Sequence, residues 1–424
     1  MNAPDAGILK QWRREFHAFP EIGWSEFVTT AKLIERLEGM GFTVLSGTAV
    51  INPAFVRGRV ESVVEQGLAA ARAHGVSEAL LQRMEGLTGC VAVFDSGRPG
   101  PTLGLRFDID CVNVSETTAA DHIPRKEGFA STNPGYMHAC GHDGHMSIGL
   151  GVAQWLVANR DRLKGRVKLL FQPAEEGVRG ARPMAESGIV DDVDYFASAH
   201  LSFIAASGTV IAGPTGFLCT VKIDLRFKGK PAHAGADPHL GRNALAAACH
   251  ATTQMLGISR HGKGMTRINV GVLRAGEGRN VVPSTAEMQI EVRGETEEIN
   301  TYMVDEVMRI ARGIATGFDV QLDTEIVGEA VDLTPDAEMV DHVMAVAKEI
   351  PAIGEVLRSR PLNGSEDATI LARRVQAHGG KAVYFVIGAD RTAGHHQAEF
   401  DFDEKQLVVG VELFAGLIGR LASR

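Results

Sequence analysis

The chain has 424 residues, enough for two or three domains of ordinary size. Its 45% hydrophobic and 22% charged residues are typical of globular proteins and exclude a disordered or fibrous chain. Lys and Arg number 43 against 52 Asp and Glu, which gives a net charge of −9, and no basic cluster offsets this charge, so we expect no nucleic-acid partner.

Two helices are predicted over residues 8–40, from apolar stripes that end at Gly39 and Gly41. Residues 53–86 are predicted to be helical and charged. Four short apolar runs follow, as expected for strands buried on both faces. They are Val91–Phe94, Leu103–Phe107, Val167–Phe171 and Tyr195–His200, and a helical pattern at 148–157 lies between the second and the third. This alternation of strand and helix indicates an α/β domain.

The pattern changes at about residue 217. The expected elements from there are strand 218–228, helix 242–257, strand 266–274, strand 285–293, helix 296–315 and strand 319–327. This β-α-β-β-α-β order is typical of a ferredoxin-like unit. The α/β pattern then resumes with two helices, strand 382–387 and a helix near 404–422. We therefore expect an α/β domain made of residues 1–216 and 331–424, with an α+β domain, 217–330, inserted between its two parts.

Residues 138–145 hold three histidines, a cysteine and an aspartate where a helix is predicted to begin. Cys140 and His142 stand two apart, and Gly141 between them allows a tight turn. Thiolate and imidazole are good zinc ligands, and imidazole also suits manganese. A lone buried cysteine is more often structural, but this density of ligand residues favours a metal site.

The sequence Gln172-Pro173-Ala174-Glu175-Glu176-Gly177 directly follows a predicted buried strand. In open α/β sheets, ligands bind beyond the carboxyl ends of the strands. Neighbouring side chains on an extended segment point in different directions, so one carboxylate could bind a metal while the other faces a water molecule beside it. A Glu-Glu pair alone would indicate an exposed acidic loop, but this position favours a role in a site.

Two further strand ends carry histidines. His200 closes one apolar run, and His395 and His396 follow strand 382–387. Five protein ligands are too many for one catalytic zinc ion but suit two metal ions that share a bridging ligand and a water molecule. The five candidates are Cys140, His142, Glu176, His200 and one of His395 and His396.

Together these motifs resemble the M20 metallopeptidases, and within them the amidohydrolase branch that includes the auxin-conjugate hydrolases. The resemblance spans nearly the whole chain and implies a di-metal α/β catalytic domain that carries a ferredoxin-like lid. The motifs that carry it are Asp108-Ile109-Asp110, residues 138–143, residues 172–177, Gly364-Ser365-Glu366-Asp367 and His395-His396.

The resemblance also implies two divalent ions per subunit, Mn²⁺ or Zn²⁺, and a role for each candidate residue. The implied ligands are Cys140, His142, Glu176, His200 and His396, with Glu175 as the general base. His396 is preferred to His395 because its spacing to Phe400 fits the branch. Other branches place a metal-binding histidine two residues before the aspartate that corresponds to Asp108, where this chain has Arg106. We therefore expect Asp108 to orient a ligand.

In the inserted domain the resemblance implies three substrate-binding residues, His233, Asn280 and Arg293. His233 is expected to reach the active site of a partner subunit, so a homodimer through the inserted domain is implied, and a related second subunit is an open alternative. An arginine can hold a carboxylate through two parallel hydrogen bonds. Without the resemblance, Arg293 would be interpreted as an ordinary surface charge.

The implied activity is metal-dependent hydrolysis of the amide bond of an N-acyl or N-aroyl amino acid. The first expected substrate is p-aminobenzoyl-glutamate, and the alternative is auxin–aspartate or another N-acyl amino acid. A catalytically silent, partner-binding subunit is a hypothesis of another class, against which Glu175 argues because a silent subunit needs no base. A thiol enzyme using Cys140 is disfavoured because no CxxC accompanies it and a metal-bound thiolate is a poor nucleophile.

Residues 50–89 look like a helical insertion relative to shorter members of the branch. Two interpretations of its apolar residues stay open: they pack on the chain's own catalytic domain and shape the pocket mouth, or they bind a partner subunit. These residues are Val60, Val63, Val64, Leu68, Val76, Leu80, Leu81 and Met84.

The expected compartment is the cytoplasm. Five scattered cysteines, an odd number, do not resemble a disulfide framework and favour a reducing environment. Trp12–Phe16 is predicted to be part of an amphipathic helix, not the apolar core of an export signal. No run approaches the roughly 20 apolar residues of a membrane helix, so we expect no membrane partner.

Overall fold

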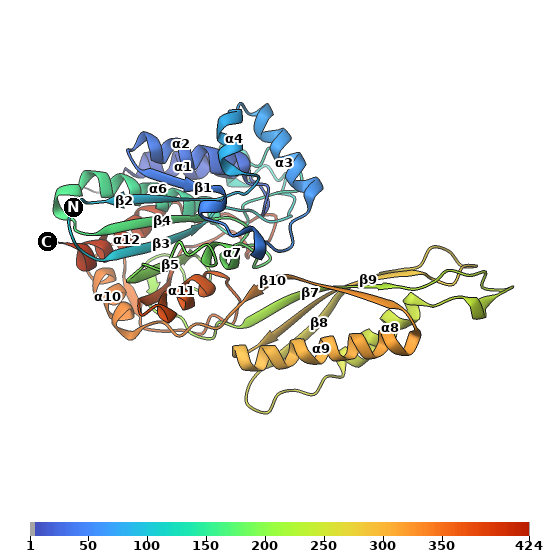
Figure 1. Cartoon of the computed structure of the whole chain (residues 1–424). Helices are drawn as coiled ribbons and strands as arrows, with labels where there is room; N and C mark the ends of the chain where they lie inside the picture. The colour runs from blue at the N-terminus through green and yellow to red at the C-terminus, as the bar shows by residue number, and fades with distance from the viewer. Residues whose placement is uncertain (1–4, 424) are drawn as a thin grey trace. The chain divides into compact units, whose positions relative to one another are not determined.

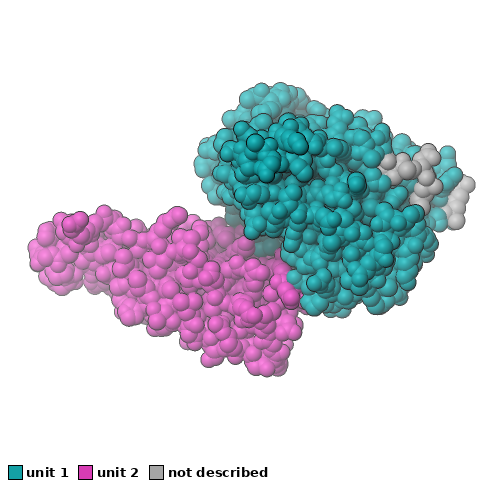
Figure 2. All heavy atoms as spheres, turned by 180° about the vertical axis from the view of Figure 1, so that it is seen from behind, with its two compact units in different colours: residues 1–215, 333–362, 367–424 teal, residues 216–332, 363–366 magenta. Residues whose placement is uncertain are grey.

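The computed structural model (Figure 1) describes residues 5–423 and divides into two compact units (Figure 2). The first unit contains the described residues up to Thr215, Leu333–Leu362 and those from Asp367 onward, and the second contains Gly216–Asp332 and Asn363–Glu366. The divisions expected after residues 216 and 330 lie within two residues of these. Asn363–Glu366 were expected in the α/β domain, but hydrogen bonds of Gly364 and Ser365 to the backbone of Leu218 hold them in the second unit.

The first unit is built on an eight-stranded mixed sheet with the order β1-β2-β4-β3-β5-β12-β6-β11 (Figure 1). The strands β4, β3, β5 and β12 are mutually parallel at its centre. On one side β2 is antiparallel to β4 and β1 is antiparallel to β2, and on the other side β6 is antiparallel to β12. Their bounds are β1 Thr43–Ser46, β2 Cys90–Asp95, β3 Thr102–Asp108, β4 Arg166–Gln172, β5 Tyr195–Leu201, β6 Thr209–Ile211, β11 Glu355–Leu357 and β12 Lys381–Ile387. Every residue of β3 is buried, which confirms the expected two-sided coverage of the central strands.

Helices cover both faces of this sheet. Phe107 of β3 packs against Phe414 of α12, and a Cβ at Gly149 of α6 would clash with Phe107, so α6 and α12 lie on that face. Because successive side chains of a strand alternate, Arg106 points to the opposite face, where it bonds Asp367 at the start of α11. The helices are α1 Ala6–Ala18, α2 Phe27–Gly39, α3 Glu61–Ala73, α4 Glu78–Met84, α5 Ile123–Lys126, α6 His142–Ala158, α7 Ala181–Ala185, α10 Ala337–Ala347, α11 Ala368–Ala377 and α12 Gln406–Ala422.

The insertion between β1 and β2 packs on the chain's own first unit. Leu80, Leu81 and Met84 of α4 and Val64 of α3 are 8% exposed or less. This burial favours the interpretation that the apolar stripe is internal packing. Val63, Leu68 and Val76 are half-buried, and Val60, just before α3, is 55% exposed.

The second unit has the expected β-α-β-β-α-β order. Its antiparallel sheet has the strand order β10-β7-β9-β8, and α8 and α9 pack together against the sheet around a core that includes Phe227, Met255 and Val307. The bounds are β7 Cys219–Lys228, α8 Ala244–Leu256, β8 Thr266–Ala275, β9 Thr285–Gly294, α9 Glu297–Phe318 and β10 Gln321–Ala330. The predicted class, an α/β domain with an inserted ferredoxin-like unit, is confirmed. Within residues 5–423, no helix is long and apolar enough to span a bilayer.

Candidate metal centre

The carboxyl ends of the parallel strands carry the predicted ligands. Gly141 has a φ of 90°, a conformation that favours glycine, and this turn places Cys140 before α6 and His142 at its first position. His200 lies near the end of β5, and the turn with Glu176 follows β4. Segments far apart in the sequence therefore meet at one edge of the sheet, as expected for an open α/β fold.

Backbone hydrogen bonds fix the orientation of two of the histidines. Nδ1 of His142 donates to the carbonyl oxygen of Asp110 at 2.8 Å, and Nδ1 of His200 donates to that of Leu201 at 2.7 Å. The lone pair of each ring is thereby left on Nε2, the arrangement of metal-bound histidines. Nε2 of His200 lies 3.5 Å from Sγ of Cys140, and Nε2 of His142 is buried without a hydrogen-bond partner. A buried acceptor of this kind fits a metal ligand.

Cys140 belongs to two groups of possible ligands. It forms one with His142 and Glu176 and another with His200 and His395, and in each group the ligand atoms lie within 4.8 Å of one another. Thiolate, imidazole and carboxylate are donors that suit zinc, and imidazole and carboxylate suit manganese. Two groups that share one thiolate fit a pair of ions with a bridging ligand.

Both histidines of the His395–His396 pair approach this centre. Nδ1 of His395 lies 3.5 Å from Sγ of Cys140, and its Nε2 lies 3.1 Å from Oγ of Ser202. Nε2 of His396 lies 3.1 Å from a carboxylate oxygen of Glu176. His396 has a φ of 63°, a strained conformation of the kind found at functional sites. Hydrogen bonds to Cys140 and Glu176 raise the pKa of His396 to about 10.

The Glu175–Glu176 turn is held by a carboxylate that the sequence analysis did not assign. The backbone N–H groups of Glu175 and Glu176 donate to the two oxygens of buried Asp110 at 3.0 and 2.9 Å. Ala174, before the pair, has a φ of 50°, so the backbone is also strained there. Oε2 of Glu175 lies 3.9 Å from Nε2 of His142. The turn therefore places one carboxylate among the ligands and the other beside them.

Asp108 lies beneath the ligands in a fully buried network. It accepts hydrogen bonds from Nδ1 of His145 at 2.6 Å and from Nη1 of Arg106 at 2.7 Å, and it lies 3.6 Å from Nε2 of His142. Burial opposes ionisation, but His142, His145 and Arg106 together hold the pKa of Asp108 well below its usual range. Arg106 also donates to Gln172 and Asp367, so the residue that stands in place of a histidine fixes Asp108.

His145 is occupied on both ring nitrogens. Its Nδ1 contacts Asp108, and its Nε2 accepts the backbone N–H of Leu201 at 2.9 Å. It therefore supports Asp108 and the end of β5 and is not available as a metal ligand.

A second buried cluster supports the start of α6 from behind. Arg13 and His17 of α1 both contact Oδ2 of Asp143 at 2.8 Å, and Arg13 also contacts Asp401 at 2.6 Å. Nε2 of His17 lies 3.0 Å from Glu116. Removing one partner of such a buried pair typically costs about 3–5 kcal/mol, because it leaves a buried charge uncompensated. Asp143, next to ligand candidate His142, is thus firmly held.

The three predicted substrate-binding residues lie in the second unit. His233 and Asn280 are exposed, and Nδ1 of His233 accepts two backbone N–H groups from Gly235 and Ala236. Arg293 of β9 pairs with Glu291 and donates to Oγ of Ser365 at 3.5 Å. Arg267 of β8, which the sequence analysis did not single out, stands opposite Arg293 in the strand register. Two guanidinium groups therefore share this part of the sheet.

Comparison with known proteins identifies the family. The model of peptidase family M20/M25/M40 matches residues 104–420, which include the whole candidate centre. The chain belongs to this family. This membership confirms the predicted class, a hydrolase of amide bonds. It also argues against the hypothesis that the chain is a thiol enzyme.

Relatives of this M20 chain cover nearly its whole length. It is 62% identical, over 99% of both chains, to a protein of Haemophilus influenzae that is named as a homolog of one subunit of p-aminobenzoyl-glutamate hydrolase. It is 43% identical to the "indole-3-acetyl-aspartic acid hydrolase" of Enterobacter agglomerans, over 96% of this chain and 94% of that one. The crystal structure of an "aminobenzoyl-glutamate utilization protein" from Klebsiella pneumoniae is similar with a TM-score of 0.84 and 37% identity, covering 98% of this chain and 96% of that one.

Proposed function

We propose that the chain is a metal-dependent amidohydrolase that cleaves N-aroyl amino acids. The first candidate substrate is p-aminobenzoyl-glutamate. The observation that carries the proposal is Glu175 next to two groups of metal-ligand residues that share Cys140. The relatives' names add the substrate class, since p-aminobenzoyl-glutamate and indole-3-acetyl-aspartate both join an aromatic acyl group to an acidic amino acid. Hydrolysis of indole-3-acetyl-aspartate is the second candidate.

We infer that Cys140, His142, Glu176, His200 and His396 would hold two divalent ions, Mn²⁺ or Zn²⁺. His396 is preferred because it contacts both Glu176 and Cys140, whereas His395 contacts Cys140 and Ser202 and packs against Phe400. When bound, the ions supply Lewis acidity and make a water molecule more acidic.

The residues of the chain would then handle the proton and the substrate. Glu175 takes a proton from the attacking water as its oxygen adds to the amide carbon. It delivers that proton to the amide nitrogen as the C–N bond breaks, and the products are a carboxylate and a free amino acid. Asp108 keeps His142 in place during the cycle. Arg293, with Arg267, offers positive charge for the carboxylate of the amino acid.

The test is a substrate screen on protein loaded with Mn²⁺ or Zn²⁺, with amine release as the readout. We expect turnover of p-aminobenzoyl-glutamate at a higher kcat/KM than of indole-3-acetyl-aspartate or aliphatic N-acyl amino acids. The reverse order would favour the second candidate. No turnover of any of these compounds by fully loaded protein would contradict the proposal and favour the silent, partner-binding subunit.

The second unit is proposed to form a homodimer in which His233 acts on the partner's site. The exposed loop with His233 and the exposed side chains of Leu256 and Leu273 on α8 and the edge strand β8 support this. Closed two-fold dimers are the commonest oligomers. One relative is named as a homolog of a hydrolase subunit, so a related second subunit remains the alternative partner.

The five free cysteines support a cytoplasmic location.

Complementation tests the role of His233. Mixing a His233→Ala protein with a Glu175→Gln protein, each nearly inactive alone, should restore up to about a quarter of the unmutated activity, since random mixing makes half of the dimers hybrid with one complete site in two. Subunit exchange is verified with differently tagged chains. Exchange without any recovery would show that His233 does not act across a dimer.

A further inference from the structure

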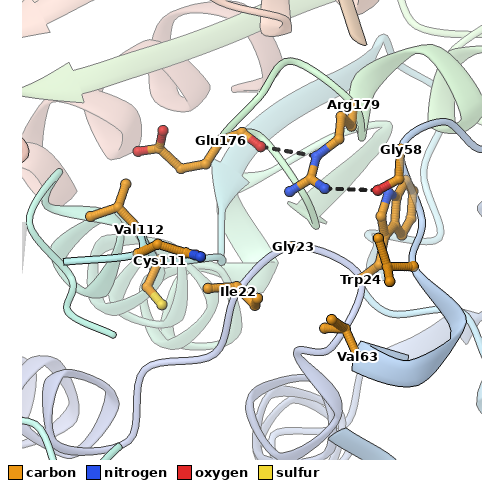
Figure 3. Close-up of a pocket in the computed structure, with 11 residues that line it drawn as sticks. Ile22, Gly23, Trp24, Gly58, Val63, Cys111, Val112, Glu176 and Arg179 are labelled. Atoms are coloured by element: carbon orange, nitrogen blue, oxygen red, sulfur yellow. Dashed lines mark hydrogen bonds between the residues drawn. The ribbon is translucent and has the colours of Figure 1, made fainter. Parts of the chain in front are cut away.

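A cavity of about 390 Å³ lies in the first unit directly beside the metal-ligand candidates. This volume falls within the range of about 300–1,000 Å³ common for small-molecule pockets. Four segments line it, and Glu176 is the proposed ligand among them. They are Ile22–Trp24, the insertion residues Gly58, Val60 and Val63, the residues Cys111, Val112 and Asn113 after β3, and Glu176 and Arg179 after β4. In Figure 3, Glu176 lies at one side of the pocket and Trp24 and Val63 lie at the other.

The insertion is pinned to the catalytic unit at this pocket. The indole Nε1 of Trp24 donates to the carbonyl oxygen of Arg57 at 2.8 Å. Arg179 donates from Nη1 to Gly58 O at 3.0 Å and from Nε to Glu176 O at 3.1 Å, so one guanidinium group links the insertion to the turn of a ligand candidate (Figure 3). The loop of the insertion is therefore a fixed wall of the pocket.

The segment Ile22–Trp24 is also built for close approach. A Cβ at Gly23 would lie 2.5 Å from Nη2 of Arg179 and 2.9 Å from Ala174, the strained residue before Glu175. Trp24 has a φ of 70°, a left-handed conformation that is unfavourable for an aromatic residue. Strain of this kind persists where the surrounding structure needs it. Here the indole ring bonds the insertion at Arg57, and Trp24 lines the pocket.

The side chains that line the pocket indicate which half of the substrate, the acyl group or the amino acid, it can bind. Apolar side chains of Ile22, Val60, Val63 and Val112 line much of the space, and its polar lining residues are Asn113, Glu176 and Arg179. Val60 is 55% exposed. Arg179 already donates from two of its nitrogens to backbone carbonyls. A pocket lined by four apolar side chains and a few polar groups suits an uncharged ring, whereas the amino acid half of the substrate carries carboxylates that need positive charge.

We propose that this pocket binds the aroyl group of the substrate and that Val60 and Val63 of the insertion set the size of the acyl group accepted. The inference rests on the proposed function, because it assigns a subsite of the same reaction. It makes residues 57–63 a specificity element, although no proposed metal ligand or general base lies within them.

The test changes the size of the side chain at position 63 and measures the selectivity between acyl groups as a ratio of kcat/KM values. Val63→Phe should lower the ratio of kcat/KM for N-benzoyl-glutamate to that for N-acetyl-glutamate by about 10–200-fold, the range for a steric change in an apolar pocket. Val63→Ala should shift selectivity a few-fold toward N-(2-naphthoyl)-glutamate over N-benzoyl-glutamate. The matched control is Val157→Phe, which adds the same ring at a 47% exposed position of α6 outside the pocket and should leave both ratios unchanged.

N-benzoyl-alanine separates the two halves of the substrate. If the effect of Val63→Phe follows the benzoyl group with either amino acid, the assignment holds. If it follows glutamate instead, the pocket binds the amino acid half and the inference is wrong. The inference is also wrong if the kcat/KM ratios are unchanged in both Val63→Ala and a folded Val63→Phe protein. If Val63→Phe does not fold, Val60→Trp takes its place in this comparison. If the unmutated chain cleaves none of these compounds, the proposed function itself fails.

Discussion

Replacing Glu175 with Gln is expected to lower kcat by about 10²–10⁴-fold while the metal content stays close to that of the unmutated protein. Glutamine keeps the size of the side chain and the backbone N–H that Asp110 holds, but it cannot accept a proton from water. The measurements are kcat from amine release and bound metal by elemental analysis of the same preparation.

Glu176→Gln is the matched control, because it makes the same chemical change one residue away. Glu176 lies 3.1 Å from His396 and within 4.8 Å of Cys140 and His142, so its loss should lower metal content first and activity as a consequence. Excess Mn²⁺ or Zn²⁺ should therefore partly rescue Glu176→Gln but not Glu175→Gln. Equal metal loss in the two variants would contradict the division of roles.

Removing the metal is expected to abolish activity, and metal binding is expected to weaken as the pH falls. Burial raises the pKa of the Cys140 thiol, and Glu176 adds to the effect. The pKa of His396 is raised to about 10 by its hydrogen bonds to Cys140 and Glu176. Because both groups hold a proton at neutral pH in the metal-free chain, metal binding must release these protons. The apparent affinity should then fall by roughly tenfold per pH unit for each proton displaced.

Calorimetric titrations in buffers of different ionisation enthalpy measure the number of protons released, and activity is followed after chelation and reloading. His396→Gln should lower metal content, whereas His395→Gln should retain it and serve as the control for an adjacent imidazole. Iodoacetamide should label Cys140 faster in metal-free protein. Full turnover by protein with no measurable metal would eliminate the proposed mechanism.

The central strands were predictable because each is an apolar run that is buried on both faces. The edge strands β1 and β11 and the short strand β6 beside β11 were not predicted, since three or four residues give no clear pattern. The direction of each strand could not be predicted from the sequence pattern either. Val91–Phe94 is as apolar as the parallel central strands, yet β2 runs antiparallel to β4. Only residues 96–101 join β2 to β3, which is too short a connection for the crossover that a parallel arrangement needs.

The ligand candidates were predictable because they cluster in short motifs at strand ends. The residues that hold them were not, because they act over long separations without a local pattern. Arg13 contacts Asp143 and Asp401, which are 130 and 388 residues away. In the sequence, Arg13 is only one charged residue of the amphipathic helix predicted around Trp12–Phe16. Asp110 could have been suspected, since it lies in the Asp108-Ile109-Asp110 motif, but its bonds to the Glu175–Glu176 turn depend on how β3 and β4 end side by side.

The interruption of the first unit by the second affects how the protein is made on the ribosome. Cys140 contacts His395, which follows 255 residues later, and Arg13 contacts Asp401, 388 residues later, so the first unit cannot close until residues 395–401 have been synthesised. The second unit is almost continuous in sequence and has its own core, so it can fold earlier. Contacts of such long range slow folding and prolong the exposure of apolar strands. We therefore expect the proposed metal centre to form only after β12 and the loop with His395 and His396 have been synthesised.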